Sequence, residues 1–209
     1  MISNKQSLNE LIKLSTQFKC ESLFDIGSRD GDDANYIASK LNIKEVFIFE
    51  PIPDSAHRIA SKYPHFNVAQ LAISDNDGES DFNAINHNNI EERGISSLRD
   101  RPDGVYVGRS DKINVKVNRF DTWYKINKRG TVDLVKLDVE GCTYEALKGF
   151  GEILKKVKIM HLETESFAYW EGQHLKTEVE SLMAPHFKLV YELHVGGFQY
   201  DQVWVNKSL

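Results

Sequence analysis

The sequence predicts a doubly wound, Rossmann-like α/β domain whose sheet is mostly parallel and ends in an antiparallel strand. Short apolar segments alternate with segments whose apolar residues recur at helical spacing, which is typical of βαβ units. Glycine-containing turns separate several of these segments. The last two predicted strands, Leu189–His194 and Tyr200–Asn206, are joined through Gly196-Gly197. So short a link permits only an antiparallel pair.

The bulk composition fits a single domain over residues 1–209. An apolar fraction of 41% is ordinary for a globular protein, and the chain is long enough to bury a core. A net charge of −5 argues against a general nucleic-acid or membrane-surface binder. Two cysteines, Cys20 and Cys142, fit a reducing compartment, and no apolar run approaches membrane-spanning length. We therefore expect a cytoplasmic protein with neither a nucleic-acid nor a membrane partner.

The first half of the chain starts with a helix and then alternates strands and helices. Ser7 and Glu10 have the spacing of a capping box, which places an N-terminal helix within residues 1–19. The apolar strand SLFDI ends at Gly27, and Ala34, Ile37 and Leu41 then recur at helical spacing. The next predicted elements are a strand at Glu45–Glu50, a helix at Pro53–Tyr63 and a strand at Asn67–Ile73, closed by a turn over residues 74–78.

The pattern lapses in the middle of the chain and then resumes. Residues 84–110 are polar and irregular, and a stretch of that length inside a compact domain is typical of a lid or a substrate-binding loop. Alternating Ile113, Val115 and Val117 predict a strand with one solvent-exposed face. The later predicted elements are a strand at Val132–Asp138, a helix at Thr143–Leu154, a strand at Lys158–Glu163 and a helix at Lys176–Ala184.

Charged residues interrupt the apolar segment VDLVKLDVEG at alternate positions. Lys136, Asp138 and Glu140 would share one face of a strand, because alternate strand residues point the same way. Burying unpaired charge costs several kcal/mol, so folding alone does not favour this arrangement. The segment indicates either a satisfied ladder of ion pairs or, as we prefer, a polar site at the carboxyl end of a central strand.

Two features indicate an adenosine-type cofactor. The first strand leads into Asp25-Ile26-Gly27-Ser28-Arg29-Asp30-Gly31, where two glycines permit a tight turn and the following helix N-terminus favours a carboxylate. Arg29 stands where the dinucleotide fingerprint has its middle glycine. Glu50 ends the next strand, roughly 20 residues on, which is a position suited to ribose hydroxyls.

Several short motifs resemble the FkbM family of S-adenosylmethionine-dependent methyltransferases. They are, in order, DIGSRDGDDA, FEP, LAISD, RFDTW, KLDVEG followed by YEALKG, and HLETES, and they cover about residues 20–165. The resemblance implies a class I methyltransferase fold with a seven-stranded sheet. It also implies S-adenosylmethionine as the cofactor and methyl transfer to a hydroxyl oxygen, often of sugars, glycans or other small metabolites.

The resemblance also implies a cofactor site. Gly27 and Gly31 would line the methionine part, Glu50 would hold the ribose, and Ala72 and Ile73 would flank the adenine. The family commonly has a small residue and Asn where this chain has Ser28 and Arg29. The residues expected at the cofactor are Asp25, Gly27, Ser28, Arg29, Gly31, Glu50, Ala72 and Ile73.

Ionisable side chains on two strands are the candidates for catalysis. A right-handed crossover through the helix at 143–154 makes the strands that hold Asp138 and Glu163 neighbours. We expect Asp138 to orient the acceptor, Glu163 or His161 to act as the base, and Glu140 to lie beside them, while Lys136 neutralises an acid below the site. These acids could instead hold Mg²⁺. No second ligand cluster supports that reading, so the sequence predicts no metal.

Other readings stay open at this stage. An NAD(P) oxidoreductase is disfavoured by the missing glycine, and a cofactor-binding protein without catalysis is disfavoured by Asp138 and Glu163. The stretch from Arg99 to Arg129 carries nine Lys or Arg against four Asp. It is either a solvated surface or an attraction for an anionic acceptor such as a phosphorylated sugar.

Overall fold

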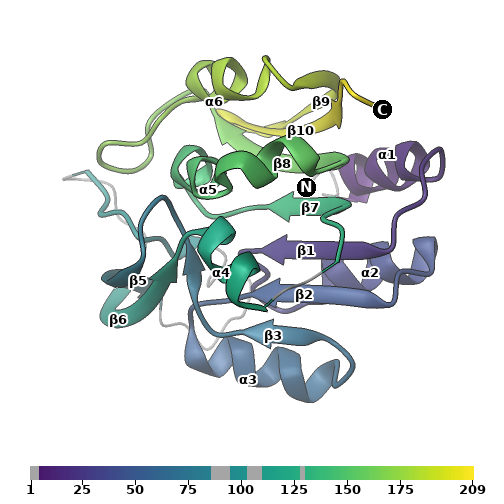
Figure 1. Ribbon diagram of the computed structural model, residues 1–209. Coiled ribbons are helices and arrows are strands. Elements are labelled where there is room, and N and C mark those ends of the chain that lie inside the picture. Colours follow the sequence, from purple (N-terminus) through teal and green to yellow (C-terminus); the bar gives the residue numbers. More distant parts are fainter. Residues whose placement is uncertain (1–4, 86–94, 103–109, 128–129) are drawn as a thin grey trace.

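The computed structural model describes residues 5–85, 95–102, 110–127 and 130–209. Two sheets organise the chain, a seven-stranded sheet in the order β3-β2-β1-β7-β8-β10-β9 and a three-stranded sheet in the order β4-β6-β5 (Figure 1). The larger sheet confirms the predicted doubly wound α/β fold and its seven strands. Its members are β1 (Ser22–Ile26), β2 (Glu45–Phe49), β3 (Asn67–Ala69), β7 (Leu134–Leu137), β8 (Ile159–Glu165), β9 (Phe187–Gly196) and β10 (Gln199–Asn206).

The strand order reverses at the centre of the large sheet. β1 is paired in parallel with β2 on one side and with β7 on the other. The chain therefore builds one half of the sheet outward from β1 and the other half outward from β7, which makes a topological switch point between them. Near the far edge β10 runs antiparallel to β9, as the short Gly-Gly link predicts, and it also runs antiparallel to β8.

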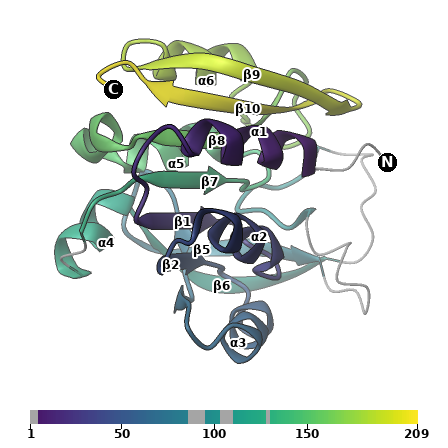
Figure 2. The same ribbon diagram turned by 90° about the vertical axis from the view of Figure 1, so that its right-hand side faces the viewer.

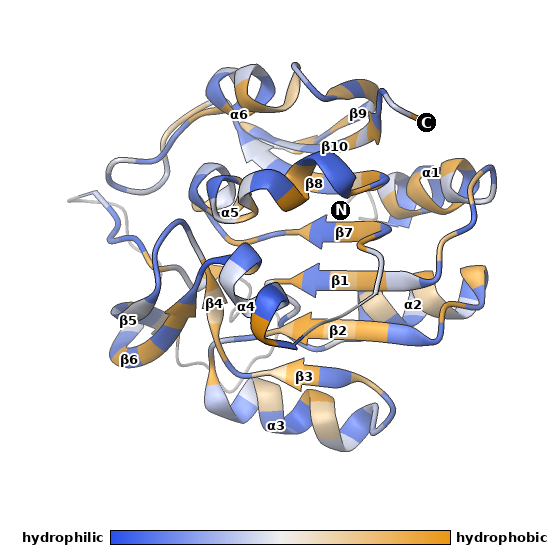
Figure 3. Cartoon of the chain, viewed as in Figure 1, coloured by the Kyte–Doolittle hydropathy of each residue, from blue (hydrophilic) through white to orange (hydrophobic). Residues whose placement is uncertain are grey.

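Helices cover both faces of the large sheet (Figures 1 and 2). One face carries α1 (Lys5–Ser15), α2 (Asp32–Leu41) and α3 (Pro53–Lys62) over an aliphatic core cluster. The other carries α4 (Phe120–Asn127), α5 (Thr143–Gly149), the 3₁₀ helix η2 (Gly151–Lys156) and α6 (Lys176–Met183) over a cluster rich in phenylalanine. Hydrophobic colour runs along much of the central strands, while the helices alternate between hydrophobic and hydrophilic residues (Figure 3). Each helix therefore buries one side.

The small sheet lies beside the carboxyl ends of β1, β2 and β7 (Figure 1). It consists of β4 (Ala72–Ile73), β5 (Gly78–Ile85) and β6 (Ser110–Asn118). The prediction of one strand over residues 67–73 is wrong, because β3 pairs with β2 in the large sheet whereas β4 pairs with β6 in the small one. The chain thus leaves the large sheet at this point and begins the layer that encloses the candidate site.

Most of the predicted lid at residues 84–110 lies outside the described residues, which omit 86–94 and 103–109. Its described middle part is tied to the fold. Ser97 forms a bridge with Asn83 of β5, and the Asn83 side chain donates to the carbonyl oxygen of Arg99 at 2.9 Å. Ser97 is therefore attached to the edge of the small sheet by an isolated bridge.

Three further details differ from the sequence prediction. Ser7 lies inside α1, where its hydroxyl donates to Asp201 at 2.5 Å, so the predicted capping box is wrong. The helix predicted from Thr143 ends at Gly149 and continues as the 3₁₀ helix, with Gly151 at a φ of +51°. The sequence reading missed α4, a short helix that buries only Phe120 fully. None of the helices in the described part of the chain has the length and apolar character needed to cross a bilayer.

Candidate active site

Three turns at the carboxyl edge of the large sheet form the candidate site. They follow β1, β2 and β7, the strands that flank the switch point. Ligands of open α/β sheets bind at this kind of position. The turns begin at Gly27, Glu50 and Asp138, so each brings a residue that the sequence had singled out.

Gly27 allows these three strand ends to meet. Its amide donates to the carbonyl oxygen of Phe49 at 3.0 Å, and the amide of Asp138 donates to Ile26 at 3.0 Å. The φ angle of Gly27 is +80°, and a Cβ at this position would lie 1.8 Å from the carbonyl oxygen of Asp138. No side chain fits there, so the close approach of β1 and β7 requires glycine.

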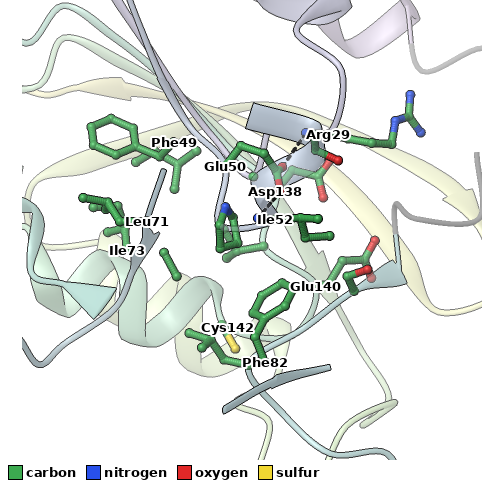
Figure 4. Close-up of a pocket in the computed structure, with 18 residues that line it drawn as sticks. Arg29, Phe49, Glu50, Ile52, Leu71, Ile73, Phe82, Asp138, Glu140 and Cys142 are labelled. Atoms are coloured by element: carbon green, nitrogen blue, oxygen red, sulfur yellow. Dashed lines mark hydrogen bonds between the residues drawn. The ribbon is translucent and has the colours of Figure 1, made fainter. Parts of the chain in front are cut away.

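Glu50 presents a buried carboxylate at the end of β2. Its Oε2 accepts from the amide of Arg29 and its Oε1 from the amide of Ile52, both at 2.9 Å (Figure 4). Burial raises the pKa of Glu50 to about 7, although the two backbone donors oppose the shift. A carboxylate has about four acceptor positions. Roughly two therefore remain for a ligand.

A pocket lies between these turns and the small sheet. Its empty volume is about 600 Å³, including space open to solvent. Leu71 and Ile73 lie toward one end, while Asp138 and Glu140 lie toward the other (Figure 4). Sequence reasoning missed part of the wall because it assigned no strand to β5 and treated the next segment as an irregular loop. The missed residues include Ile52, Phe82, Ser96, Leu98 and Val139. The apolar alternation of Phe82 and Ala84 was the available signal.

Lys136 is the centre of a buried ion network directly below the pocket. Its side chain is 3% exposed, and its Nζ lies 3.3 Å from Asp138, 3.6 Å from Asp33 and 3.7 Å from Asp25. Burial alone would lower the pKa of Lys136, but the charges of Asp25, Asp138 and Asp33 outweigh burial and raise it. The ammonium group therefore stays charged, and it neutralises acids below the site.

The turn after β7 positions Glu140. Glu140 has a φ of +48° and Gly141 one of +81°, so the chain reverses sharply here. A Cβ on Gly141 would lie 2.6 Å from the ring of Trp170. Arg99 holds the same turn, since its Nε donates to the carbonyl oxygen of Gly141 at 3.0 Å and its guanidinium pairs with Glu145 at 2.8 Å. The pocket edge is thus braced from two sides.

Asp138, Glu140 and Glu163 form a carboxylate cluster at the ends of β7 and β8. One oxygen from each lies within 4.8 Å of the others. Glu163 is 7% exposed, and its Oε1 has no hydrogen-bond partner among the described residues. Burial first, and then the charges of Asp138 and Glu140, raise the pKa of Glu163. Glu165, two residues further along β8, accepts from the side chain of Gln173 at 2.7 Å.

His161 faces α1 and does not line the pocket. Its Nε2 lies 3.0 Å from the hydroxyl of Ser7, which in turn donates to Asp201. Burial and the charge of Lys136 lower the pKa of His161 to about 3. The ring is therefore neutral, and it belongs to a polar network between the sheet and the first helix.

The predicted cofactor residues divide into two groups. The residues that line the pocket are Gly27, Arg29, Glu50, Ala72 and Ile73. Asp25 is fully buried and accepts from the hydroxyl of Ser28 at 2.5 Å, so both lie beneath the turn. Gly31 has a φ of +79° and precedes α2, where it packs against Tyr63. Of the catalytic candidates, the structure brings together Asp138, Glu140 and Glu163.

Comparison with known proteins places this site in a family. The Methyltransferase FkbM domain matches residues 25–199. The 2-O-methyltransferase NoeI of Sinorhizobium fredii (strain NBRC 101917 / NGR234) is 27% identical over 183 residues, which cover 83% of this chain and 75% of NoeI.

Solved structures share the fold at low identity. A protein of the NADB-Rossmann superfamily from Streptococcus agalactiae superposes with a TM-score of 0.54 at 12% identity, covering 99% of this chain and 69% of that one. Sp1610 from Streptococcus pneumoniae gives a TM-score of 0.52 at 12% identity, covering 99% and 71%. The domain match spans most of the chain, from β1 to the start of β10. The chain therefore belongs to the FkbM methyltransferase family, which confirms the predicted family, enzyme class and S-adenosylmethionine cofactor.

Proposed function

We propose that this methyltransferase transfers the methyl group of S-adenosylmethionine to a hydroxyl oxygen of a sugar, a glycan or another small metabolite. One observation carries the proposal: the carboxylates of Asp138 and Glu140 line the same pocket as Glu50, at the carboxyl edge of the sheet. The similarity to a 2-O-methyltransferase supports oxygen as the acceptor atom.

The residues of the pocket fit the cofactor. Glu50 offers its remaining acceptor positions to the ribose hydroxyls, and its burial strengthens such hydrogen bonds. Leu71, Ala72 and Ile73 supply an apolar wall for the adenine. Gly27 lines the pocket with its main chain, and it has no side chain to cover that position. We assign the methionine part of the cofactor to this end of the pocket.

When bound, S-adenosylmethionine would supply a methyl carbon on a sulfonium sulfur, which would be transferred to the acceptor oxygen with S-adenosylhomocysteine as the leaving group. Positioning of the acceptor against that carbon contributes effective molarities of about 10⁵ M and more. We assign the orientation of the acceptor hydroxyl to Asp138, which borders the pocket and is held by Lys136. Glu163 is assigned as the acceptor of the hydroxyl proton, since it lies beside Asp138.

Two measurements test the proposal directly. Titration calorimetry should show binding of S-adenosylmethionine and S-adenosylhomocysteine but not of NAD(H). An assay for S-adenosylhomocysteine release, run over a panel of sugars, glycans and metabolite alcohols, should then identify an acceptor. Binding of NAD(H) in place of the methyl donor would favour the oxidoreductase reading. Cofactor binding with turnover only on amine acceptors would contradict the assignment to oxygen.

Replacing Glu50 with Ala should weaken S-adenosylhomocysteine binding by about 1–3 kcal/mol, because buried ribose hydroxyls lose their acceptor. Titration calorimetry measures the change. Asp54→Ala is the matched control, since this exposed carboxylate lies four residues further on, in α3, and does not line the pocket. Equal affinities of the two variants would place the ribose elsewhere.

Cofactor binding should also depend on pH through Glu50. Its pKa is raised to about 7, so the group gains a proton as the pH falls through that value. A protonated carboxyl accepts hydrogen bonds poorly, and we expect affinity to fall between about pH 8 and pH 6. The neighbouring charge of Asp25 raises this pKa and that of Arg58 lowers it. A Glu50→Gln variant should show little change over the same range, and an equally steep profile would assign the effect to another group.

The proposal also includes the charge of the acceptor and the cellular location of the protein. Several basic residues of the stretch from Arg99 to Arg129 already have acidic partners: Arg99 pairs with Glu145, Lys112 with Asp100, and Arg119 with Asp121. We therefore favour a neutral acceptor over an anionic one or a nucleic acid. Both cysteines are free, which is consistent with the cytoplasmic location expected from the sequence.

A further inference from the structure

We infer that Asp138, Glu140 and Glu163 bind one divalent cation, Mg²⁺ or Mn²⁺, at the edge of the cofactor pocket. The sequence alone predicted no metal, because no second ligand cluster could be recognised in it. The structure instead gathers three carboxylates from two strands, with one oxygen of each within 4.8 Å of the others. Oxygens bound to one ion of this size, each about 2.0–2.2 Å from the metal, lie no more than about 4.4 Å apart, so a small closure of the three carboxylates would let them share an ion.

A second observation is the unpartnered oxygen of Glu163. The residue is 7% exposed, and Oε1 has no hydrogen-bond partner among the described residues. A buried carboxylate oxygen without a donor is costly, so native proteins nearly always satisfy such atoms. The Glu163 carboxylate belongs to the three-acid cluster, so a cation between the acids would satisfy this oxygen as well as the cluster.

The charge balance around the cluster supports the same conclusion. Lys136 is the buried cation nearest to it, but its ammonium group is shared among Asp25, Asp33 and Asp138. Neither Glu140 nor Glu163 has an ion pair within the described part of the chain, although the charges of Arg101 and Arg29 act on Glu140. Three carboxylates in such close contact repel one another unless protons or a cation compensate them. A divalent ion would compensate most of their charge without protonation.

The donor set selects the kind of ion. All three ligands are carboxylate oxygens, which suit Mg²⁺ and Mn²⁺ better than softer metals. Cys142 also lines the pocket, but it does not belong to the cluster. An ion held by three protein ligands keeps positions for water or for a substrate oxygen. The role of this ion in supporting the acceptor hydroxyl depends on the proposed function, whereas the existence of the ion site depends only on the three carboxylates.

Electron paramagnetic resonance of Mn²⁺ tests the site in the intact chain without any acceptor, because bound Mn²⁺ loses the sharp signal of the free ion. We expect one Mn²⁺ per chain, displaced by Mg²⁺. Glu163→Gln should weaken Mn²⁺ binding by about tenfold or more, since affinity in such sites follows the number of ligand charges. Asp33→Asn is the matched control, because it removes a carboxylate from the Lys136 network and leaves the cluster intact. It should bind Mn²⁺ as the native protein does.

Two outcomes would overturn the inference: native protein that binds no Mn²⁺ at about 1 mM, a range that includes weak protein sites, or equal Mn²⁺ affinities of Glu163→Gln and Asp33→Asn. Calorimetry with S-adenosylhomocysteine on the same samples verifies that each variant is folded. It also separates the two hypotheses, because cofactor binding in a protein that ignores Mn²⁺ would leave the proposed function standing. Conversely, a protein that binds Mn²⁺ but not S-adenosylhomocysteine would contradict the proposed function and leave the cation site standing.

Discussion

Replacing Asp138 with Asn is expected to lower turnover by about 10²-fold or more, because a neutral amide cannot orient or polarise the acceptor hydroxyl as a carboxylate does. The fold should survive. Asp138 has 23% of its side chain exposed, and the ion pair that the change removes is one of three that Lys136 makes. We expect the free energy of unfolding to change by about 1 kcal/mol, as for other partly exposed pairs. Steady-state kinetics and thermal denaturation measure the two effects.

The control for this prediction is Asp33→Asn. It makes the same chemical change, and it also removes a partner of Lys136, but Asp33 does not line the pocket. Asp33→Asn should therefore melt like the Asp138 variant while retaining near-native turnover. If both variants lost turnover equally, Asp138 would act only by holding Lys136. If Asp138→Asn turned over normally, the carboxylate would have no part in the reaction.

Replacing Lys136 with Met should destabilise the protein by about 3–5 kcal/mol, the usual cost of leaving a buried charge without its partner. Asp25 is fully buried, and besides the lysine its carboxylate has only the hydroxyl of Ser28 among the described residues. The double variant Lys136→Met/Asp25→Asn removes both charges and should recover much of the loss. Denaturant unfolding measures the three stabilities. A single variant as stable as the native protein would show that the network does not hold the sheet edge together.

The loss of stability in the Lys136→Met variant should depend on pH, and it should be larger at high pH. Burial raises the pKa of Asp25, while Lys136 opposes that shift. Without the lysine, the pKa of Asp25 in the folded protein rises further above its value in the unfolded chain. Between these two pKa values Asp25 is therefore protonated in the folded protein and ionised in the unfolded chain. Stability of the variant therefore falls as the pH rises between the two pKa values. Lys136→Met should be closer to the native stability at pH 5 than at pH 8.

Local patterns in the sequence predicted most of the large sheet, because each strand is defined by residues next to one another. The alternating charges at Lys136, Asp138 and Glu140 were interpreted correctly in part. The expectation that all three share one strand face is wrong, because β7 ends at Leu137 and Glu140 lies in the turn that follows. Lys136 does neutralise buried acids, and Asp138 does border a pocket. Both statements follow from the period of a strand and from the cost of burying charge. The same period also placed Glu163 beside Asp138, once the crossover made β7 and β8 neighbours.

What the sequence did not reveal depends on partners far along the chain. The split between β3 and β4 follows from pairing with different strands, and no local pattern records which strand that is. The fit of Ser7 to a capping box was coincidental, since its real partner is Asp201. His161 shares a strand face with Glu163, yet α1 covers one and leaves the other at the pocket edge. Packing between elements decides such cases.

The bond between Ser7 and Asp201 joins residues 194 positions apart. Helix α1 precedes every strand of the large sheet in the chain, whereas β10, which carries Asp201, follows all the other strands of that sheet. The apolar side of α1, with Leu8 and Leu11, packs in a core cluster that also contains Val203. During synthesis part of this face stays uncovered until β10 has been made, although α2 and β8 contact α1 earlier. A nascent chain that has not yet reached Gln199 cannot complete the contacts of α1, so this part of the core closes only when β10 is in place.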